Sequence, residues 1–132
     1  MECLTVLKSF SYGSTEIELH VNMSIGIGGD KWPAAELFCC MISSSTWQAY
    51  FMSLFYRKKV IELGAGTGLA AILVDRLFKP DLVNITDQLS HVDLIKQNIS
   101  HNRCINSVAS VFDWLDLPDR CEPYDIVLAF EW

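Results

Sequence analysis

The spacing of hydrophobic residues changes near residue 59 and divides the chain into two parts. In the first part, apolar and polar residues alternate over 3–10 and 15–22, and a turn around Gly13 separates the two runs. A period of two is typical of strands, so this pattern predicts an N-terminal β-hairpin. From Lys59 onward, short apolar runs alternate with helical patterns, which predicts parallel strands joined by crossover helices.

Two short helices are predicted between the hairpin and residue 59. The first is capped by Asp30 and has Pro33 in its first turn, and the polar run 43–46 separates it from the second. The segment 37–56 carries no charged side chain, so a membrane-spanning helix is the alternative. Polar residues at its centre would be costly in a bilayer, which favours two buried helices. Their expected buried residues are Ala34, Leu37, Phe38 and Met41 in the first and Trp47, Tyr50, Phe51 and Leu54 in the second.

Four strands are predicted in the second part, at 60–63, 82–86, 108–112 and 124–131. Pro80 ends the helix after the first strand, and Ser90 with Asp93 resembles a capping box at the start of the next helix. The sequence therefore predicts an α/β fold with a parallel sheet. The expected inward-facing helical residues are Leu69, Ile72, Leu73 and Leu77, followed by Val92, Ile95 and Ile99.

Composition narrows the class of protein. A chain of 132 residues with 51% hydrophobic and 20% charged residues should form a single domain, with residues 1–58 as its N-terminal part and 59–132 as its cofactor-binding part. The net charge of −6 argues against a nucleic-acid partner. The five cysteines have no CxxC spacing, so we expect reduced thiols and no metal site. Reduced thiols are typical of a cytoplasmic protein, which we expect here. We also expect a monomer.

The segment 60–69, VIELGAGTGL, has the pattern of a ligand site. A strand stops at Gly64, Gly66 and Gly68, and a helix follows. Glycine permits positive φ and a close approach of ligand to backbone, while a helix N-terminus offers unpaired N–H groups. The pattern indicates a site for a nucleotide-like cofactor. The dinucleotide fingerprint would need a third glycine at position 69, where this chain has Leu69, so a dinucleotide is disfavoured.

The form ELGAGTGL, with Glu62 ahead of the glycines, resembles the first motif of class I S-adenosylmethionine-dependent methyltransferases. The resemblance implies a Rossmann-like sheet and S-adenosylmethionine as cofactor, with Glu62 near its amino end. It also implies that Asp87, at the end of NITD, accepts both ribose hydroxyls, although a loop aspartate or helix cap is the alternative. Asp113 and Trp114 match the place where the superfamily binds adenine, and simple packing is the alternative for them.

Four further stretches, DKWPAAEL, TDQ, KQNISHN and YDIVLAFEW, look like the seven-β-strand protein-lysine methyltransferases. This resemblance implies a protein substrate with a lysine acceptor. It implies that Trp32 lies beside the cofactor, although Trp32 could equally be a core residue. It also implies that Glu131 is a catalytic residue of the lysine channel, where it orients or deprotonates the amine or only shapes the channel.

The family fold continues with three further strands, whereas this sequence stops at Trp132. We therefore expect an incomplete methyltransferase domain with its last strands missing. One alternative is a non-catalytic remnant that binds cofactor or serves as an interaction surface. Another is an enzyme with a small-molecule or nucleic-acid acceptor; nucleic acid is disfavoured by charge and by FEW where an Asn-Pro-Pro-aromatic motif would stand.

Overall fold

The computed structural model describes residues 5–22, 33–120 and 122–130. A β-hairpin and two helices precede an alternating series of strands and helices, as the hydrophobic pattern predicts. The elements are β1 (Thr5–Tyr12), β2 (Thr15–Asn22), α1 (Pro33–Ile42), α2 (Gln48–Phe55), β3 (Lys59–Leu63), α3 (Leu69–Phe78), β4 (Leu82–Asp87), α4 (Leu89–His101), β5 (Ser107–Val111) and β6 (Ile126–Ala129).

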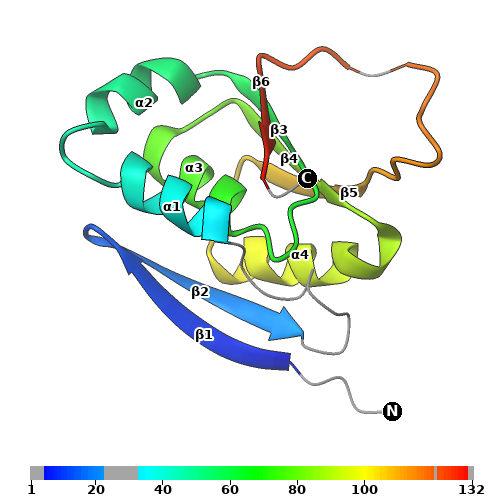
Figure 1. Ribbon diagram of the computed structural model, residues 1–132, viewed down its shortest axis with the longest axis horizontal. Coiled ribbons are helices and arrows are strands. Elements are labelled where there is room, and N and C mark those ends of the chain that lie inside the picture. The colour runs from blue at the N-terminus through cyan, green and yellow to red at the C-terminus, as the bar shows by residue number, and fades with distance from the viewer. Residues whose placement is uncertain (1–4, 23–32, 121, 131–132) are drawn as a thin grey trace.

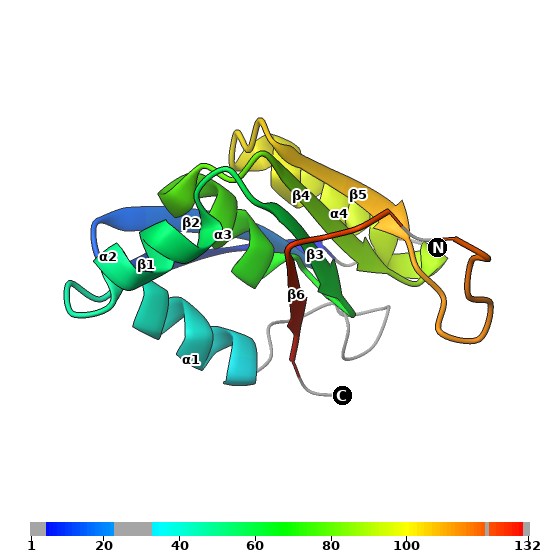
Figure 2. The same ribbon diagram turned by 90° about the horizontal axis from the view of Figure 1, so that it is seen from above.

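The central sheet has the strand order β5-β4-β3-β6, and each neighbouring pair is parallel. Helices α3 and α4 lie between this sheet and the separate β1-β2 hairpin, while α1 and α2 pack beside α3 (Figures 1 and 2). The predicted α/β architecture with a parallel, Rossmann-like sheet is confirmed. The last predicted strand is shorter than expected, because only Ile126–Ala129 pairs with β3.

The core lies between the helices and one face of the sheet. Val60, Val83 and Ile85 point into it from the strands and are fully buried. Ile72 from α3 and Ile95 from α4 meet them and are fully buried as well. Each such side chain contributes about 1.5–3 kcal/mol when removed from water. The predicted inward faces of α3 and α4 are therefore confirmed.

The opposite face of the sheet carries a polar cluster. Asn84 of β4 receives a hydrogen bond from the Ser110 hydroxyl at 2.7 Å and donates one to the Tyr124 hydroxyl at 3.0 Å. Val127 of β6, next to Ile61 in register, is 58% exposed.

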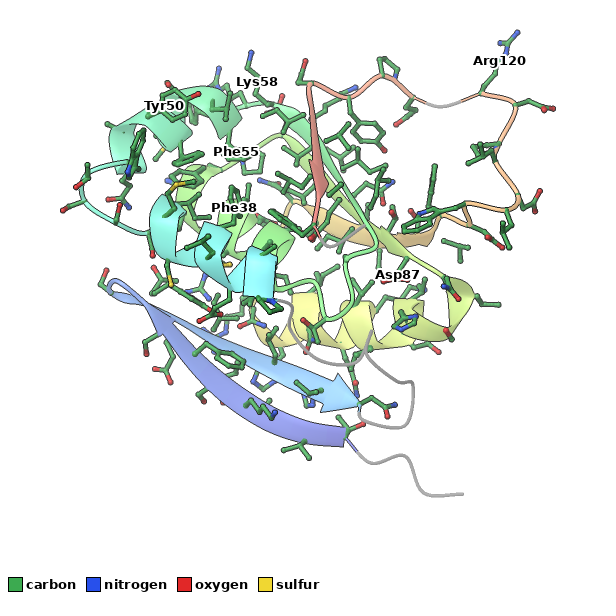
Figure 3. The ribbon with its side chains drawn as sticks, viewed as in Figure 1. Phe38, Tyr50, Phe55, Lys58, Asp87 and Arg120 are labelled. Carbon is green, nitrogen blue, oxygen red and sulfur yellow. The ribbon has the colours of Figure 1, made fainter. Side chains whose placement is uncertain are left out.

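The loop from β5 to β6 extends away from the body of the molecule, and Arg120 lies at its outer side (Figure 3).

The predicted buried face of α1 is correct only in part. Phe38 packs against the core, but Leu37 and Met41 are 72% and 39% exposed. The buried residues of the helix are Ala35, Cys39 and Ile42. Almost every residue of PAAELFCCMI is apolar, so several stripes at helical spacing fit the sequence equally well. The helix is oriented by the hairpin, because the Tyr12 hydroxyl donates a hydrogen bond to the Glu36 carboxylate.

The predicted break between α1 and α2 is confirmed, and its cause is local. The Ser43 and Ser44 hydroxyls donate to the carbonyls of Cys39 and Met41 at the end of α1, at 2.8 and 2.9 Å. Serine side chains that bond backbone carbonyls compete with continued helix. In the part of the chain that the structure describes, no helix is long and apolar enough to cross a membrane.

Helix α2 is only half buried, in contrast to the prediction of a buried helix. Phe51 and Phe55 are buried, and Phe55 stacks on Phe78 of α3 with ring centroids 5.7 Å apart. Tyr50 is 57% exposed and points outward, whereas Phe38 and Phe55 point toward the interior (Figure 3). Trp47 and Leu54 are likewise exposed. The short helix lies at the edge of the helix layer, so only one side of it meets α3.

The predicted capping box at Ser90 is also wrong. Helix α4 begins at Leu89, and its N-cap is Gln88, which makes no side-chain cap hydrogen bond. Ser90 is therefore already inside the first turn, where its hydroxyl pairs with Nδ1 of His91 at 3.1 Å. The predicted helix cap Asp30 lies outside the described residues.

Candidate functional site

The strand order places a topological switch point at β3. The chain leaves β3 toward β4 on one side, and β6 later pairs with β3 on the other side. In open parallel sheets, ligands bind in the crevice outside the carboxyl ends of the strands at such a point. The glycine loop 64–68 lies there, between the end of β3 and the start of α3.

The glycine loop needs glycine for its backbone conformation. Gly64, Gly66 and Gly68 have φ values of 65°, 63° and 87°, in the left-handed region that side chains disfavour. Gly68 is also closely packed, because a Cβ there would lie 3.4 Å from Cδ1 of Ile72. The loop is tied to the next strand by the Ala65 N–H, which donates to the Thr86 carbonyl at 3.0 Å. Its path is therefore fixed before any ligand arrives.

Asp87 is the residue that joins the glycine loop to the end of β4. Its Oδ2 accepts the Gly66 N–H at 2.8 Å, and its Oδ1 accepts the Gln88 N–H at 2.6 Å. The carboxylate is buried beside the first turn of α4 (Figure 3). Each carboxylate oxygen has a second lone pair and can accept a further hydrogen bond. The two backbone N–H donors thus hold the Asp87 carboxylate in one orientation at the end of β4, beside the switch point.

Glu62 is the second buried acid of the site. It is 2% exposed, and its Oε1 atom has no hydrogen-bond partner. The pKa of Glu62 is raised to about 8, chiefly by burial; a hydrogen bond from the Ala71 backbone lowers it, and the negative charge of Asp87 adds a smaller rise. An unpartnered buried carboxyl is costly unless a donor or cation meets it. The sequence motif identified Glu62, but not the unusual state of its carboxyl group.

His91 is a site residue that the sequence did not predict. Its Nδ1 lies 3.5 Å from Oδ1 of Asp87, one helical turn earlier, and its Nε2 is buried without a hydrogen-bond partner. The TDQ motif ends at Gln88 and does not include His91. Asp87 ends β4 and His91 lies in the first turn of α4, so their contact depends on how the helix leaves the strand.

Asp113 and Trp114 follow β5 and lie at the carboxyl-terminal edge of the sheet, as the glycine loop does. The Phe112 N–H donates to the Asp87 carbonyl at 2.9 Å, which brings the end of β5 to the end of β4. Trp114 is 47% exposed, and its ring atom Cζ2 lies 3.4 Å from the position that a Cβ on Gly64 would occupy. Asp113 is exposed and accepts the Leu115 N–H at 2.9 Å.

The structure therefore brings most of the predicted residues together. The glycine loop is hydrogen-bonded to Asp87, the buried Glu62 lies close enough to Asp87 for their charges to interact, and Trp114 lies against Gly64. Trp32 and Glu131 lie outside the described residues. Among the residues that the structure describes, no three His, Cys, Asp or Glu side chains are grouped to hold a metal ion.

These features fit S-adenosylmethionine better than a phosphate-bearing ligand. The buried acid Asp87 would repel a pyrophosphate, whereas it attracts an ammonium and a sulfonium, and an ammonium beside Glu62 favours the ionised form of that buried acid. The orphaned Oε1 of Glu62 offers an acceptor for an ammonium donor. The half-exposed ring of Trp114 offers an apolar surface beside the loop.

Comparisons with known proteins agree with this geometry. Residues 12–131 match the family described as lysine methyltransferase. The chain is 32% identical over 125 residues to EEF1A lysine methyltransferase 3 of Xenopus tropicalis, a similarity that covers 91% of this chain and 52% of that protein. The chain thus spans about half the length of this relative.

Two solved structures share the fold at low sequence identity. A protein-L-isoaspartate O-methyltransferase has a TM-score of 0.54 at 18% identity, over 97% of this chain and 34% of that one. The Pyrococcus abyssi tRNA (uracil-54, C5)-methyltransferase, in complex with S-adenosyl-L-homocysteine, has a TM-score of 0.57 at 13% identity, over 92% of this chain and 27% of that one. The resemblance found from the motifs is confirmed: the chain belongs to the lysine methyltransferase family, whose methyl donor is S-adenosylmethionine.

Proposed function

We propose that this chain forms the S-adenosylmethionine-binding half of a protein-lysine methyltransferase, with the cofactor at the carboxyl ends of β3, β4 and β5. One observation carries the proposal. A buried oxygen of Glu62 has no hydrogen-bond partner, beside a glycine loop that is bonded to Asp87. The ammonium group of the cofactor supplies the missing donor, and its positive charge is matched by the acids.

Each remaining site residue has a role in this proposal. Asp87 accepts the two ribose hydroxyls with its free lone pairs, while Gly66 and Gln88 keep the carboxylate in place. Hydrogen bonds to a charged acceptor contribute about 1.5–3 kcal/mol each. Asp113 accepts from the exocyclic amine of adenine, and Trp114 covers the adenine ring. The position of Trp114 against the glycine loop supports this role.

When bound, the cofactor supplies an electrophilic methyl group, and its transfer forms an N–C bond to a neutral lysine amine as the S–C bond breaks. The residues of this chain hold and orient the donor, which lowers the entropic cost of the encounter. A protein acceptor is supported by the family match and by the name of the Xenopus relative, which acts on a lysine of EEF1A. Glu131 orients or deprotonates the amine and Trp32 lies beside the cofactor in this proposal; both rest on the sequence motifs alone.

We also propose a reducing compartment such as the cytoplasm, and a monomer. Among the described residues, Cys40 and Cys104 are not in disulfides, which supports the first. The monomer stays a prediction, which sedimentation of the purified chain would test.

Isothermal titration with S-adenosylhomocysteine tests the cofactor site. We expect Asp87→Ala to weaken binding at least about 100-fold, because two hydrogen bonds to a charged acceptor are lost. Asp81→Ala is the matched control: it removes an exposed aspartate just before the opposite end of the same strand and should leave binding unchanged. Circular dichroism establishes that both variants are folded.

The double substitution Gly64→Val and Gly66→Val provides a second test of the same site. Both positions have positive φ, and a side chain at Gly64 would meet Trp114. We expect no measurable binding by a folded double variant. A folded wild-type chain that does not bind S-adenosylhomocysteine would overturn the proposed function, and retained affinity in the double variant would show that the site is elsewhere.

A further inference from the structure

Asn98 of α4 and Asn102, the C-cap of the same helix, hold the edge of the hairpin. Asn98 accepts the His20 N–H at 2.6 Å and donates to the His20 carbonyl at 3.0 Å. Asn102 accepts the Glu18 N–H at 3.0 Å and donates to the Glu18 carbonyl at 2.7 Å. Each carboxamide therefore pairs with one residue of β2 as the peptide group of a neighbouring strand would.

The spacing of helix and strand explains why two asparagines can do this. Positions i and i+4 of a helix are about 6 Å apart along its axis, and positions i and i+2 of a strand are about 6.6 Å apart. The spacing between Asn98 and Asn102 is therefore close to that between His20 and Glu18, so each asparagine can pair with one of these residues. Both asparagines are buried, so these bonds form away from water.

The two asparagines differ in their third hydrogen bond. Nδ2 of Asn98 donates at 2.9 Å to the carbonyl of Thr67, between Gly66 and Gly68 in the glycine loop. Nδ2 of Asn102 donates at 2.8 Å to the carbonyl of Asn98 within the same helix. Only Asn98 therefore connects the hairpin to the loop.

We propose that Asn98 is a positioning residue for the cofactor, which couples the hairpin to the glycine loop through the Thr67 carbonyl. Asn98 does not touch the ligand. It fixes the peptide between Thr67 and Gly68, and the same loop presents the Gly66 N–H to Asp87. This inference rests on the proposed function, in which the glycine loop receives S-adenosylmethionine.

The effect of Asn98 on binding comes from the population of the competent loop. Thr67 is 1% exposed, so its carbonyl has no ready access to water if the Asn98 donor is removed. Other loop conformations, in which water can reach the Thr67 carbonyl, then become relatively more stable. The apparent dissociation constant rises in inverse proportion to the fraction of chains whose loop is correctly placed. The loss of one typical hydrogen bond shifts the equilibrium between the correct loop conformation and the others about fivefold, and the fraction of correctly placed loops falls by at most that factor.

The experiment compares Asn98→Ala with Asn102→Ala by titration with S-adenosylhomocysteine. Asn98→Ala removes two hydrogen bonds to His20 of β2, and Asn102→Ala removes the equivalent two to Glu18. Both variants should therefore lower stability to urea by a similar amount. We expect the dissociation constant to rise about two- to fivefold in Asn98→Ala and to be unchanged in Asn102→Ala. Equal dissociation constants in the two folded variants would overturn the proposal.

Nuclear magnetic resonance of the wild-type chain provides a second readout, which needs neither folded variants nor ligand. We expect the side-chain amide protons of Asn98 to be protected from exchange and to show a nuclear Overhauser effect to the α protons of Gly68. Rapid exchange of these protons would refute the coupling. If the wild type fails to bind S-adenosylhomocysteine, the proposed function fails, and this measurement still decides whether Asn98 holds the loop.

Discussion

The buried carboxyl of Glu62 makes the stability of the fold depend on pH. Burial raises its pKa to about 8 in the folded chain, against 4.5 as the ordinary value. Between these two values the folded state binds a proton that the unfolded state has released, so stability falls as pH rises. The contribution of Glu62 is complete below about pH 4.5 and is lost as pH passes through about 8.

The magnitude follows from the same two values. One pKa unit corresponds to about 1.4 kcal/mol, so raising the pH from 5.5 to 7.5 should lower the contribution of Glu62 by about 2–3 kcal/mol. Glu62→Gln removes the titration and keeps the size of the side chain. Its amide oxygen can still accept the backbone hydrogen bond from Ala71.

Urea denaturation at both pH values measures the effect. We expect the wild-type midpoint to fall, relative to that of Glu62→Gln, by about 1–2 M between pH 5.5 and 7.5. Other titrating groups act on both proteins and cancel in this difference. Parallel pH profiles for the two proteins would refute the reasoning, because Glu62 would then have the same affinity for protons in both states.

Two further predictions concern groups away from the cofactor loop. Tyr124→Phe should lower the free energy of unfolding by about 1 kcal/mol, because the amide of Asn84 loses its bond to the phenol; an unchanged urea midpoint would contradict this. In a mass-spectrometric time course with iodoacetamide, Cys40, which is exposed, should react well before Cys39, which is buried. Cys104 should also react slowly, since burial raises its pKa to about 12, and labelling as fast as that of Cys40 would contradict the structure.

The sequence predicts those parts of the site that depend on local signals. The glycines at 64, 66 and 68 mark the loop, and Asp87 follows a strand pattern, so both could be found without coordinates. The bond from Asn98 to Thr67 could not be found in this way, because it joins segments that meet only after α4 has packed on β2. The same is true of the unpartnered state of Glu62, which depends on burial by the whole fold.

The fold shows the same division between local and distant causes. The period of the pattern located the strands and helices from Lys59 onward, since alternation is a local property. The orientation of α1 was predicted only in part, because the sequence PAAELFCCMI contains a single charged residue, Glu36, and that residue turns toward Tyr12 of the hairpin. A charged residue marks the solvent face only when no buried partner competes for it.

The strand order also has a consequence for the sequence of folding events. Val60 of β3 pairs with Val83 of β4, but also with Ile126 of β6, much farther along the chain. Closing the longer loop costs more entropy, so pairing of β6 should follow that of β3 with β4. The proposed contacts from Glu62 to Trp114 all precede β6 in the chain. During synthesis the glycine loop and the acids around it can therefore form before β6 has been made.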